Sequence, residues 1–224
     1  MKQLSDEEIL ASWKKNVSPW RAAIQNGEIA SRVEVTNQAI VDAVIERSPS
    51  SVLDVGCGEG WLVRRLADSG IDALGIDAVS EFIECGTEND GRFRVLSHED
   101  LSIDSVGEKF DVVVSNFSLL GKESVDHVFQ QVPSLLNQAG AFIVQTIHPV
   151  AGCGEGKYED GWRQGSWDGF SDEFCDPAPW YFRTVDSWKL LFEKNGFTLN
   201  HVREPLNPRS GSPASIVFTG TISA

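Results

Sequence analysis

The segment VLDVGCGEGW, residues 52–61, constrains the fold of this chain more than any other feature of its sequence. Residues 51–55 form a short apolar run that predicts a buried strand, and residues 60–69 have the leucine spacing of a helix. Gly56 and Gly58 lie in the turn between them, where glycine permits positive φ angles and brings backbone N–H groups close to a ligand. Because ligands of open α/β sheets bind beyond the carboxyl ends of strands, this turn predicts a ligand site.

The rest of the chain alternates apolar runs with amphipathic segments, which is typical of a parallel sheet covered by helices. The pattern predicts strands at 51–55, 72–77, 93–96, 110–116, 140–147, 197–202 and 214–220. It predicts helices at 5–15, 19–25, 33–46, 60–69, 79–86 and 123–136, and a last helix between Thr184 and Asn195. Pro133 is expected to kink or split the helix that contains it.

The predicted order defines an α/β fold, a three-layer sandwich around a seven-stranded, mostly parallel sheet. The 11 residues between the last two strands are too few for a crossover helix, so the last strand should run antiparallel. A chain of 224 residues fits a single domain, residues 1–224, in which residues 1–32 form a helical cap.

Charge and cysteine content exclude several classes of partner. The net charge is −14 and no basic stripe is visible, so we expect neither nucleic acid nor an anionic membrane surface as a partner. No apolar run is long enough to span a membrane. The four cysteines form no C-x-x-C pair and no His pair has zinc-ligand spacing, so we expect no metal and a reduced, cytoplasmic protein, monomeric or homodimeric.

The spacing of the glycines separates two kinds of nucleotide site. A dinucleotide fingerprint, G-x-G-x-x-G, requires a third glycine where this chain has Trp61. The pattern D-x-G-x-G-x-G, beginning at Asp54, instead resembles motif I of the class I S-adenosylmethionine (SAM)-dependent methyltransferases. Asp77 ends the next strand, 21 residues after Gly56, where that family holds the SAM ribose with a carboxylate. The resemblance implies SAM as cofactor and S-adenosylhomocysteine as product, and a cofactor site that contains Asp54, Gly56, Cys57, Gly58, Gly60, Asp77 and Ala78.

The resemblance extends to other cofactor contacts, each with a plain alternative. The segment LSHEDL places Ser97 and His98 where the family meets the adenine, although His98 is equally a solvated loop residue. Asn116 and Phe117 end a strand beside the expected methionine part of SAM, and Phe117 is alternatively a core residue. Arg32 is expected to bind the SAM carboxylate, or else to be a surface arginine.

The tetrapeptide CGEG recurs at residues 153–156 without a strand leading in or a helix leading out, so this copy predicts no second cofactor turn. It begins an insertion, residues 149–183, that is rich in aromatic residues and has no regular period. The insertion resembles that of uncharacterised bacterial small-molecule methyltransferases. We expect it to act as a lid that binds the methyl acceptor, together with N-terminal helices that carry Trp13 and Trp20; a stabilising subdomain is the alternative.

Methyl transfer is a displacement at a carbon on sulfur, in which the enzyme chiefly aligns the reactants. His148 follows the fifth strand and is the candidate general base, or else it fixes the His-Pro turn. Residues of the insertion and its end are candidates for binding the acceptor: Tyr158, Trp162, Tyr181 and Arg183. The acceptor is expected to be a small molecule that takes the methyl group on oxygen, nitrogen or carbon.

Two other functions remain open on the sequence. An NAD-dependent oxidoreductase would also use an acid such as Asp77, but Trp61 disagrees with its fingerprint. A SAM-binding protein that transfers no methyl group would share every cofactor residue.

Overall fold

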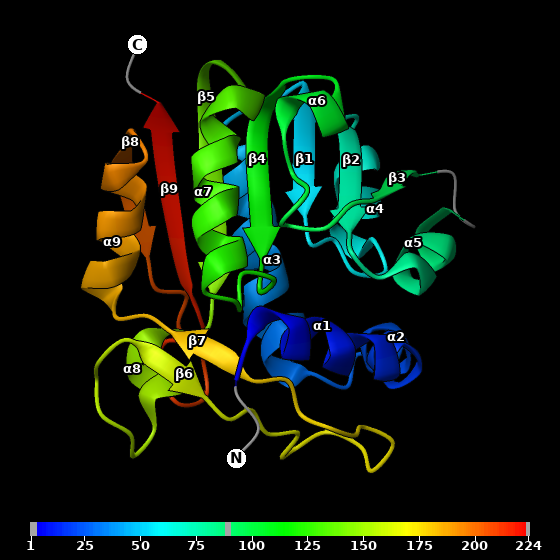
Figure 1. Ribbon diagram of the computed structural model, residues 1–224, viewed down its shortest axis with the longest axis vertical. Coiled ribbons are helices and arrows are strands. Elements are labelled where there is room, and N and C mark those ends of the chain that lie inside the picture. The colour runs from blue at the N-terminus through cyan, green and yellow to red at the C-terminus, as the bar shows by residue number, and fades with distance from the viewer. Residues whose placement is uncertain (1–3, 88–90, 223–224) are drawn as a thin grey trace.

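The computed structural model describes residues 4–87 and 91–222 and contains a seven-stranded sheet in the order β3-β2-β1-β4-β5-β9-β8 (Figure 1). Strand β9 is antiparallel to both of its neighbours, and the other described strand pairs of this sheet are parallel. The α/β fold with an antiparallel last strand is therefore confirmed. The strands are β1 (Ser51–Val55), β2 (Asp72–Asp77), β3 (Arg92–Val95), β4 (Phe110–Asn116), β5 (Leu136–Thr146), β8 (Phe197–Arg203) and β9 (Ile216–Ile222).

Helices cover both faces of the sheet, because successive strand residues point to opposite sides and both sides are apolar. Val52, Val112 and Val114 pack toward one face, and Leu53 and Val113 pack toward the other. The first face is covered by α3 (Asn37–Ile45), α4 (Trp61–Ala67) and α5 (Ser80–Thr87). The second face is covered by α6 (Ile103–Val106), α7 (Glu123–Leu135) and α9 (Val185–Lys194). No helix in the described ranges is both long and apolar enough to cross a membrane.

Three local features differ from the predicted elements. The helix predicted at 33–46 begins one residue earlier, as a π-helical turn, η1 (Arg32–Thr36), that precedes α3. The single turn α6 was not predicted; Ser102 and Ser105 cap it reciprocally. Pro133 does not split α7, which runs through it and ends two residues later. Pro133 lacks the N–H that would donate to the carbonyl four residues earlier, but only two helical residues follow it, so a bend there displaces little of α7.

Two peripheral segments lie below the carboxyl ends of the strands (Figure 1). One is the N-terminal pair of helices, α1 (Asp6–Lys15) and α2 (Val17–Gln25). The other is the insertion, which is more regular than its sequence predicts: it contains α8 (Pro149–Cys153) and a two-stranded sheet of β6 (Gly161–Arg163) and β7 (Trp180–Phe182). The second CGEG thus begins at the last residue of α8, and Gly154 follows with a positive φ of 54°.

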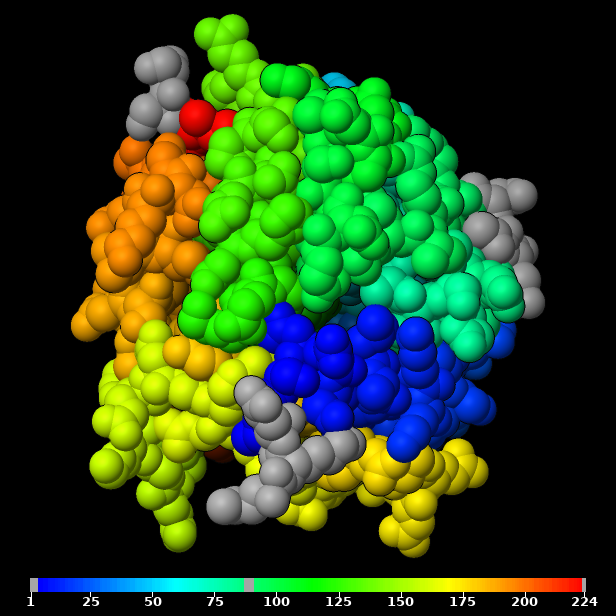
Figure 2. Space-filling view, viewed as in Figure 1, coloured from blue at the N-terminus to red at the C-terminus, as the bar shows by residue number. Residues whose placement is uncertain are grey.

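The insertion packs against the N-terminal helices through aromatic rings and hydrogen bonds. The ring centroids of Trp13 and Trp167 are 5.7 Å apart, and those of Trp20 and Phe170 are 6.4 Å apart. The Asn16 side chain donates to the Cys175 carbonyl at 2.8 Å and accepts from the Cys175 N–H at 2.9 Å. In Figure 2 the N-terminal helices therefore form one continuous surface with the insertion below the sheet.

Candidate functional site

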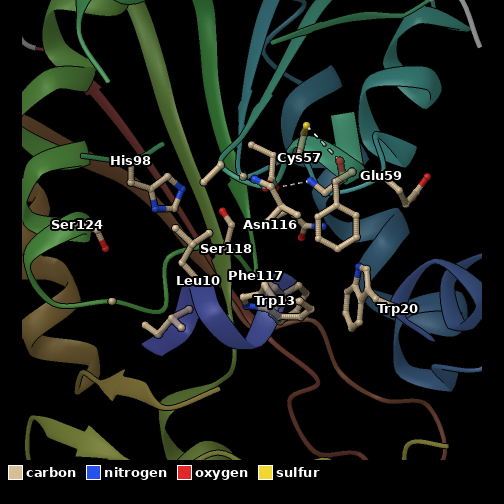
Figure 3. A pocket seen from close by; sticks show the side chains of 18 of the residues that line it. Leu10, Trp13, Trp20, Cys57, Glu59, His98, Asn116, Phe117, Ser118 and Ser124 are labelled. Carbon is tan, nitrogen blue, oxygen red and sulfur yellow. Dashed lines mark hydrogen bonds between the residues drawn. The ribbon is translucent and has the colours of Figure 1, made fainter. Parts of the chain in front are cut away.

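A cavity lies between the carboxyl ends of β1, β2 and β4 and the helices α1 and α2 (Figure 3). The glycine turn therefore opens into it from above, and aromatic side chains of α1 and α2 close it from below. Its lining residues are Asp6, Ile9, Leu10, Trp13, Trp20, Arg32, Gly56, Cys57, Gly58, Glu59, Trp61, Asp77, Ala78, Val79, Phe82, His98, Glu99, Asn116, Phe117, Ser118, Gly121 and Ser124.

The glycine turn presents backbone to this cavity. The N–H groups of Gly56 and Cys57 both donate to the Ile76 carbonyl, at 2.8 and 2.9 Å, which holds the turn against β2. Gly58 has a φ of 56°, and a Cβ atom there would come no nearer than 3.9 Å to the Trp20 ring nitrogen. The space beside Gly58 is therefore open for a ligand to approach the main chain.

Gly60 has a different task from the other two glycines. It precedes α4 with a φ of 85° and does not line the cavity. A Cβ atom at Gly60 would overlap the ring of Phe93, the side chain of β3 that packs there. The third glycine thus permits close packing of the turn against β3, a role that the spacing alone did not separate from cofactor binding.

Asp77 joins the two loops that border the cavity. Its carboxylate accepts from the N–H of Gly58 and from that of Val79, each at 2.9 Å. Burial raises the pKa of Asp77, and these backbone hydrogen bonds oppose that shift. The carboxylate is therefore held at the end of β2, between the glycine turn and the residues before α5.

Asp54 lies behind the cavity rather than in its wall. Its side chain is buried, 2% exposed, and Oδ1 has no hydrogen-bond partner among the described residues. Burial raises the pKa of Asp54 to about 8, and the carboxylates of Asp77 and Glu59 add to the shift, whereas Arg32 opposes it. At neutral pH this carboxyl group is largely protonated.

Arg32 is the cationic side chain of the cavity wall. Its guanidinium lies 5.5 Å from the Trp20 ring centroid and 5.2 Å from that of Trp61. Nε donates to Asn37 Oδ1 at 3.3 Å, but the buried Nη2 has no partner in the described chain. Burial lowers the pKa of Arg32 to about 10, so the group remains charged at neutral pH. Arg32 is therefore a buried cation with a donor to spare, not a surface arginine.

The end of β4 carries a strained residue that lines the cavity. Phe117 has a φ of 57°, a left-handed conformation that non-glycine residues rarely adopt. It is held there by its N–H bond to the Gln145 carbonyl at 2.8 Å, while the Gln145 side chain donates to Asn116 Oδ1 at 2.8 Å. Ser118 follows and donates to the Val55 carbonyl at 2.6 Å. With this backbone conformation, three consecutive residues, 116–118, line the cavity.

Of the two candidate cofactor residues in the loop after β3, His98 lies at the cavity and Ser97 does not. His98 lines the cavity and its ring points into it (Figure 3). Ser97 does not line the cavity; its hydroxyl donates to Asp100 Oδ2 at 2.9 Å and accepts from the Asp100 N–H.

His148 and the candidate acceptor residues lie outside the cavity wall. His148 is buried at the start of α8, where Nε2 pairs with Glu204 at 3.1 Å and Nδ1 has no partner among the described residues. Arg183 donates to the carbonyls of Gly121 and Lys122, at 2.8 and 3.2 Å, and so supports the loop before α7. The remaining candidates have structural contacts within the insertion or with α9: Tyr158 (with Val185), Trp162 and Tyr181 (with each other).

Among the cavity residues that the sequence did not predict, three come from α1: Asp6, Ile9 and Leu10. With Trp13, which was expected near the acceptor, they follow the three- and four-residue spacing of one helix face. That spacing was visible, but an amphipathic helix covers a hydrophobic core as often as a ligand. Only the packing of α1 below the strands distinguishes the two.

Comparison with known proteins agrees with this geometry. A family model described as a methyltransferase domain matches residues 29–202. An uncharacterised methyltransferase from Anoxybacillus flavithermus is 24% identical over 172 residues, 76% of this chain and 79% of the relative. A ubiquinone biosynthesis O-methyltransferase from Xanthomonas axonopodis is 31% identical over 116 residues, 48% of this chain and 47% of the relative.

Among solved structures, the 1,6-didemethyltoxoflavin N1-methyltransferase of Burkholderia thailandensis, with its substrate and S-adenosylhomocysteine bound, has a similar fold. Its TM-score is 0.66 at 18% identity, covering 100% of this chain and 93% of that one. The fold of this chain, with a cavity at the carboxyl ends of its strands, is the Rossmann-like fold of solved methyltransferases. This chain belongs to the methyltransferase domain family, and the class predicted from the sequence, a SAM-dependent methyltransferase, is confirmed at the level of family and fold.

Proposed function

We propose that the cavity binds SAM and that the protein transfers its methyl group to a small molecule. One observation carries this proposal: the buried guanidinium of Arg32, which has a donor without a partner among the described residues, shares a cavity with the open backbone at Gly58 and the carboxylate of Asp77. A ligand that satisfies all three has an anionic end and a hydroxylated middle, and SAM has a carboxylate and a ribose.

The residues present fit SAM in a definite order along the cavity. Arg32 would donate to the carboxylate, and its aromatic neighbours would exclude water from that pair. Asp77 would accept from the ribose hydroxyls, since its loop hydrogen bonds leave lone pairs on both oxygens. The main chain near Ala78 and His98 would border the adenine, and Asn116 and Phe117 the methionine part.

The chain's own contribution to the chemistry is alignment and exclusion of water. SAM, when bound, supplies a methyl group on a positively charged sulfur. The strained turn at Phe117 fixes one wall against which an acceptor is positioned, and alignment of this kind contributes roughly 7–11 kcal/mol to a displacement reaction. Trp13 and Trp20 close the lower side and separate the reacting atoms from solvent.

Calorimetric titration with SAM, S-adenosylhomocysteine and NAD tests the cofactor. We expect the first two to bind and NAD not to bind. Binding of NAD alone would favour an oxidoreductase, and absence of SAM binding would overturn the proposal. SAM binding without release of S-adenosylhomocysteine with any acceptor of a broad metabolite panel would leave a SAM-binding protein that is not an enzyme.

Arg32→Ala tests the orientation of SAM. A charge-assisted hydrogen bond contributes about 1.5–3 kcal/mol, so we expect S-adenosylhomocysteine to bind on the order of 10- to 150-fold more weakly. 5′-Methylthioadenosine lacks the carboxylate, and its affinity should change less than twofold. Arg47→Ala, at an exposed arginine outside the cavity, is the matched control. Equal losses for both ligands would show that Arg32 only supports the fold of the cavity wall.

We also propose that the protein acts on a small molecule, not on nucleic acid, and that it is cytoplasmic. The net charge of −14 opposes nucleic acid, and the family match supports a small-molecule acceptor. The four cysteines are free, as in a reducing compartment, which supports a cytoplasmic enzyme that acts as a monomer or homodimer.

A further inference from the structure

One side of the cavity contains side chains that the proposed SAM site does not use, including the imidazole of His98, of which that site uses only the main chain. Along α1, Ile9, Leu10 and Trp13 present an apolar face to the cavity. His98 lies across from this face, with Ser118 and Ser124 on the same side (Figure 3). Because the proposed SAM site takes up the groups on the other side, this half of the cavity is left for the methyl acceptor.

The imidazole of His98 is placed to act on a bound molecule. Its Nε2 lies 3.3 Å from the point where a Cβ atom on Gly56 would be, a point that the Ser118 side chain already borders. The His98 ring has no hydrogen-bond partner in residues 4–87 and 91–222, whereas His127 and His148 each have one. A neutral imidazole has one acceptor nitrogen, and here it is free for a ligand.

The protonation state of His98 suits a base. Burial lowers the pKa of the imidazole, and the carboxylates of Glu99 and Asp6 oppose that shift. Asp6 lies on α1, but its two oxygens accept from the N–H groups of Lys122 and Ser124, at 2.8 and 2.6 Å. These bonds disperse its charge at the start of α7, so His98 remains neutral near pH 7.

The charged residues of the cavity wall disfavour an anionic acceptor. Four carboxylates line the cavity, and Arg32 is the one lysine or arginine among the described lining residues. Because Arg32 is assigned to the cofactor carboxylate, an anionic acceptor would find no cation in its own half. Aromatic and aliphatic side chains line the rest, which favours a flat, uncharged ring.

We propose that the acceptor is an uncharged aromatic compound with a hydroxyl group, and that His98 is the catalytic base that receives the hydroxyl proton. This inference rests on the proposed methyl transfer from SAM. As the acceptor oxygen attacks the methyl carbon, an O–C bond forms and the C–S bond breaks. The electron pair of the broken bond stays on sulfur, and the proton passes from the acceptor oxygen to Nε2 of His98.

A set of related acceptors tests the substrate class. Catechol is uncharged, 3,4-dihydroxybenzoate carries a carboxylate and dopamine an ammonium group, with the same reacting hydroxyls. We expect release of S-adenosylhomocysteine with catechol at a kcat/KM at least tenfold above that with the benzoate and no lower than that with dopamine, so a preference for dopamine would contradict an uncharged acceptor. SAM binding with no turnover of catechol, or with the benzoate preferred, would overturn this inference and leave the proposed SAM site intact. Failure to bind SAM would instead overturn the proposed function.

His98→Asn tests the base, with catechol as acceptor. General base catalysis contributes about 10²- to 10⁴-fold, so we expect kcat to fall by that order while the SAM Kd changes less than twofold. His201→Asn, at an exposed histidine of β8, is the matched control and should retain full activity.

The pH profile distinguishes a base from a structural residue. In the wild type, kcat/KM should rise as pH increases through the lowered pKa of His98, since only the neutral ring accepts a proton. In His98→Asn that limb should vanish, and activity should return at alkaline pH as catechol ionises by itself. A variant with unchanged kcat, or one whose SAM affinity and Tm fall together with kcat, would overturn the assignment.

Discussion

Two aspartates at the ends of neighbouring strands show how position decides the role of a residue. Asp77 ends β2 at the cavity, where two backbone N–H groups hold its carboxylate. Asp54 lies on β1 behind the cavity wall, where its buried Oδ1 has no hydrogen-bond partner in residues 4–87 and 91–222. The first is arranged to accept from a ligand. The second holds a proton at neutral pH, because an ionised carboxylate there would be poorly solvated.

Asp54→Asn should stabilise the ligand-free protein at pH 7 by about 1–3 kcal/mol. At that pH the Asp54 carboxylate of the unfolded chain must take up a proton on folding, and the amide of the variant need not. The pKa of Asp54 rises from 3.8 to about 8 on folding, so the folded state holds more protons between these pH values. The contribution of this group to the free energy of unfolding is therefore full below pH 3.8 and is lost as pH rises toward 8.

Urea unfolding of the wild type and Asp54→Asn from pH 5 to 9 measures this effect. The difference between them should grow with pH up to about 8. Asp68→Asn, at an exposed aspartate, is the control. A difference that is constant across this range would contradict a raised pKa.

At the level of elements, the N-terminal helices depend on the insertion for their position. Ser12 donates to the Asp176 carbonyl at 2.5 Å, and Asn16 exchanges two hydrogen bonds with the backbone of Cys175. Trp13 and Trp20 join the aromatic cluster of the insertion and at the same time line the cavity. The insertion thus acts on the cavity through α1 and α2, since its predicted acceptor residues lie outside the cavity wall.

Asn16→Ala should loosen this connection. Its side chain is buried, so the Cys175 N–H loses its partner and the Cys175 carbonyl keeps only the Trp167 ring N–H, at a cost of roughly 1–3 kcal/mol. We expect faster hydrogen exchange at the Cys175 amide and a several-fold faster dissociation of SAM. Asn26→Ala, an exposed asparagine after α2, should change neither. Unchanged exchange at Cys175 in Asn16→Ala would show that the aromatic contacts alone hold the insertion.

At the level of the whole molecule, the cavity is built from many separate elements between Asp6 and Ser124. Its walls come from α1 and α2, from the turns after β1 and β2, from the loop after β3 and from the end of β4. A ligand that contacts all of these elements stabilises them together, because it binds the folded state and not the unfolded chain.

SAM at 100 times its Kd should therefore raise the free energy of unfolding by about 2.7 kcal/mol. For a chain of this size that corresponds to an increase in Tm of roughly 5–11 °C. Differential scanning calorimetry measures it, and a single transition should shift as one. A second transition that SAM does not move would show that a segment unfolds independently of the cavity.

The sequence predicted the sheet well because each strand is short, apolar and bounded by turn residues. SVLDV and FDVVVSN became β1 and β4 with the expected bounds. It predicted the insertion poorly, since α8 and the β6–β7 pair are too short to show a period and are held by contacts with distant segments. The start of β5 was also misplaced, because its first residues have no apolar alternation.

The sequence by itself determined the strand–turn–helix at residues 51–67, with Asp54 on the strand and the glycines in the turn, because these features depend on local backbone preferences. Only the tertiary structure decided which residues share the cavity. It brought α1 and Arg32 under the strands, turned His98 inward and left His148 outside. Side chains far apart in sequence meet only when burial of the sheet's two apolar faces has placed their elements, and no local pattern records that outcome.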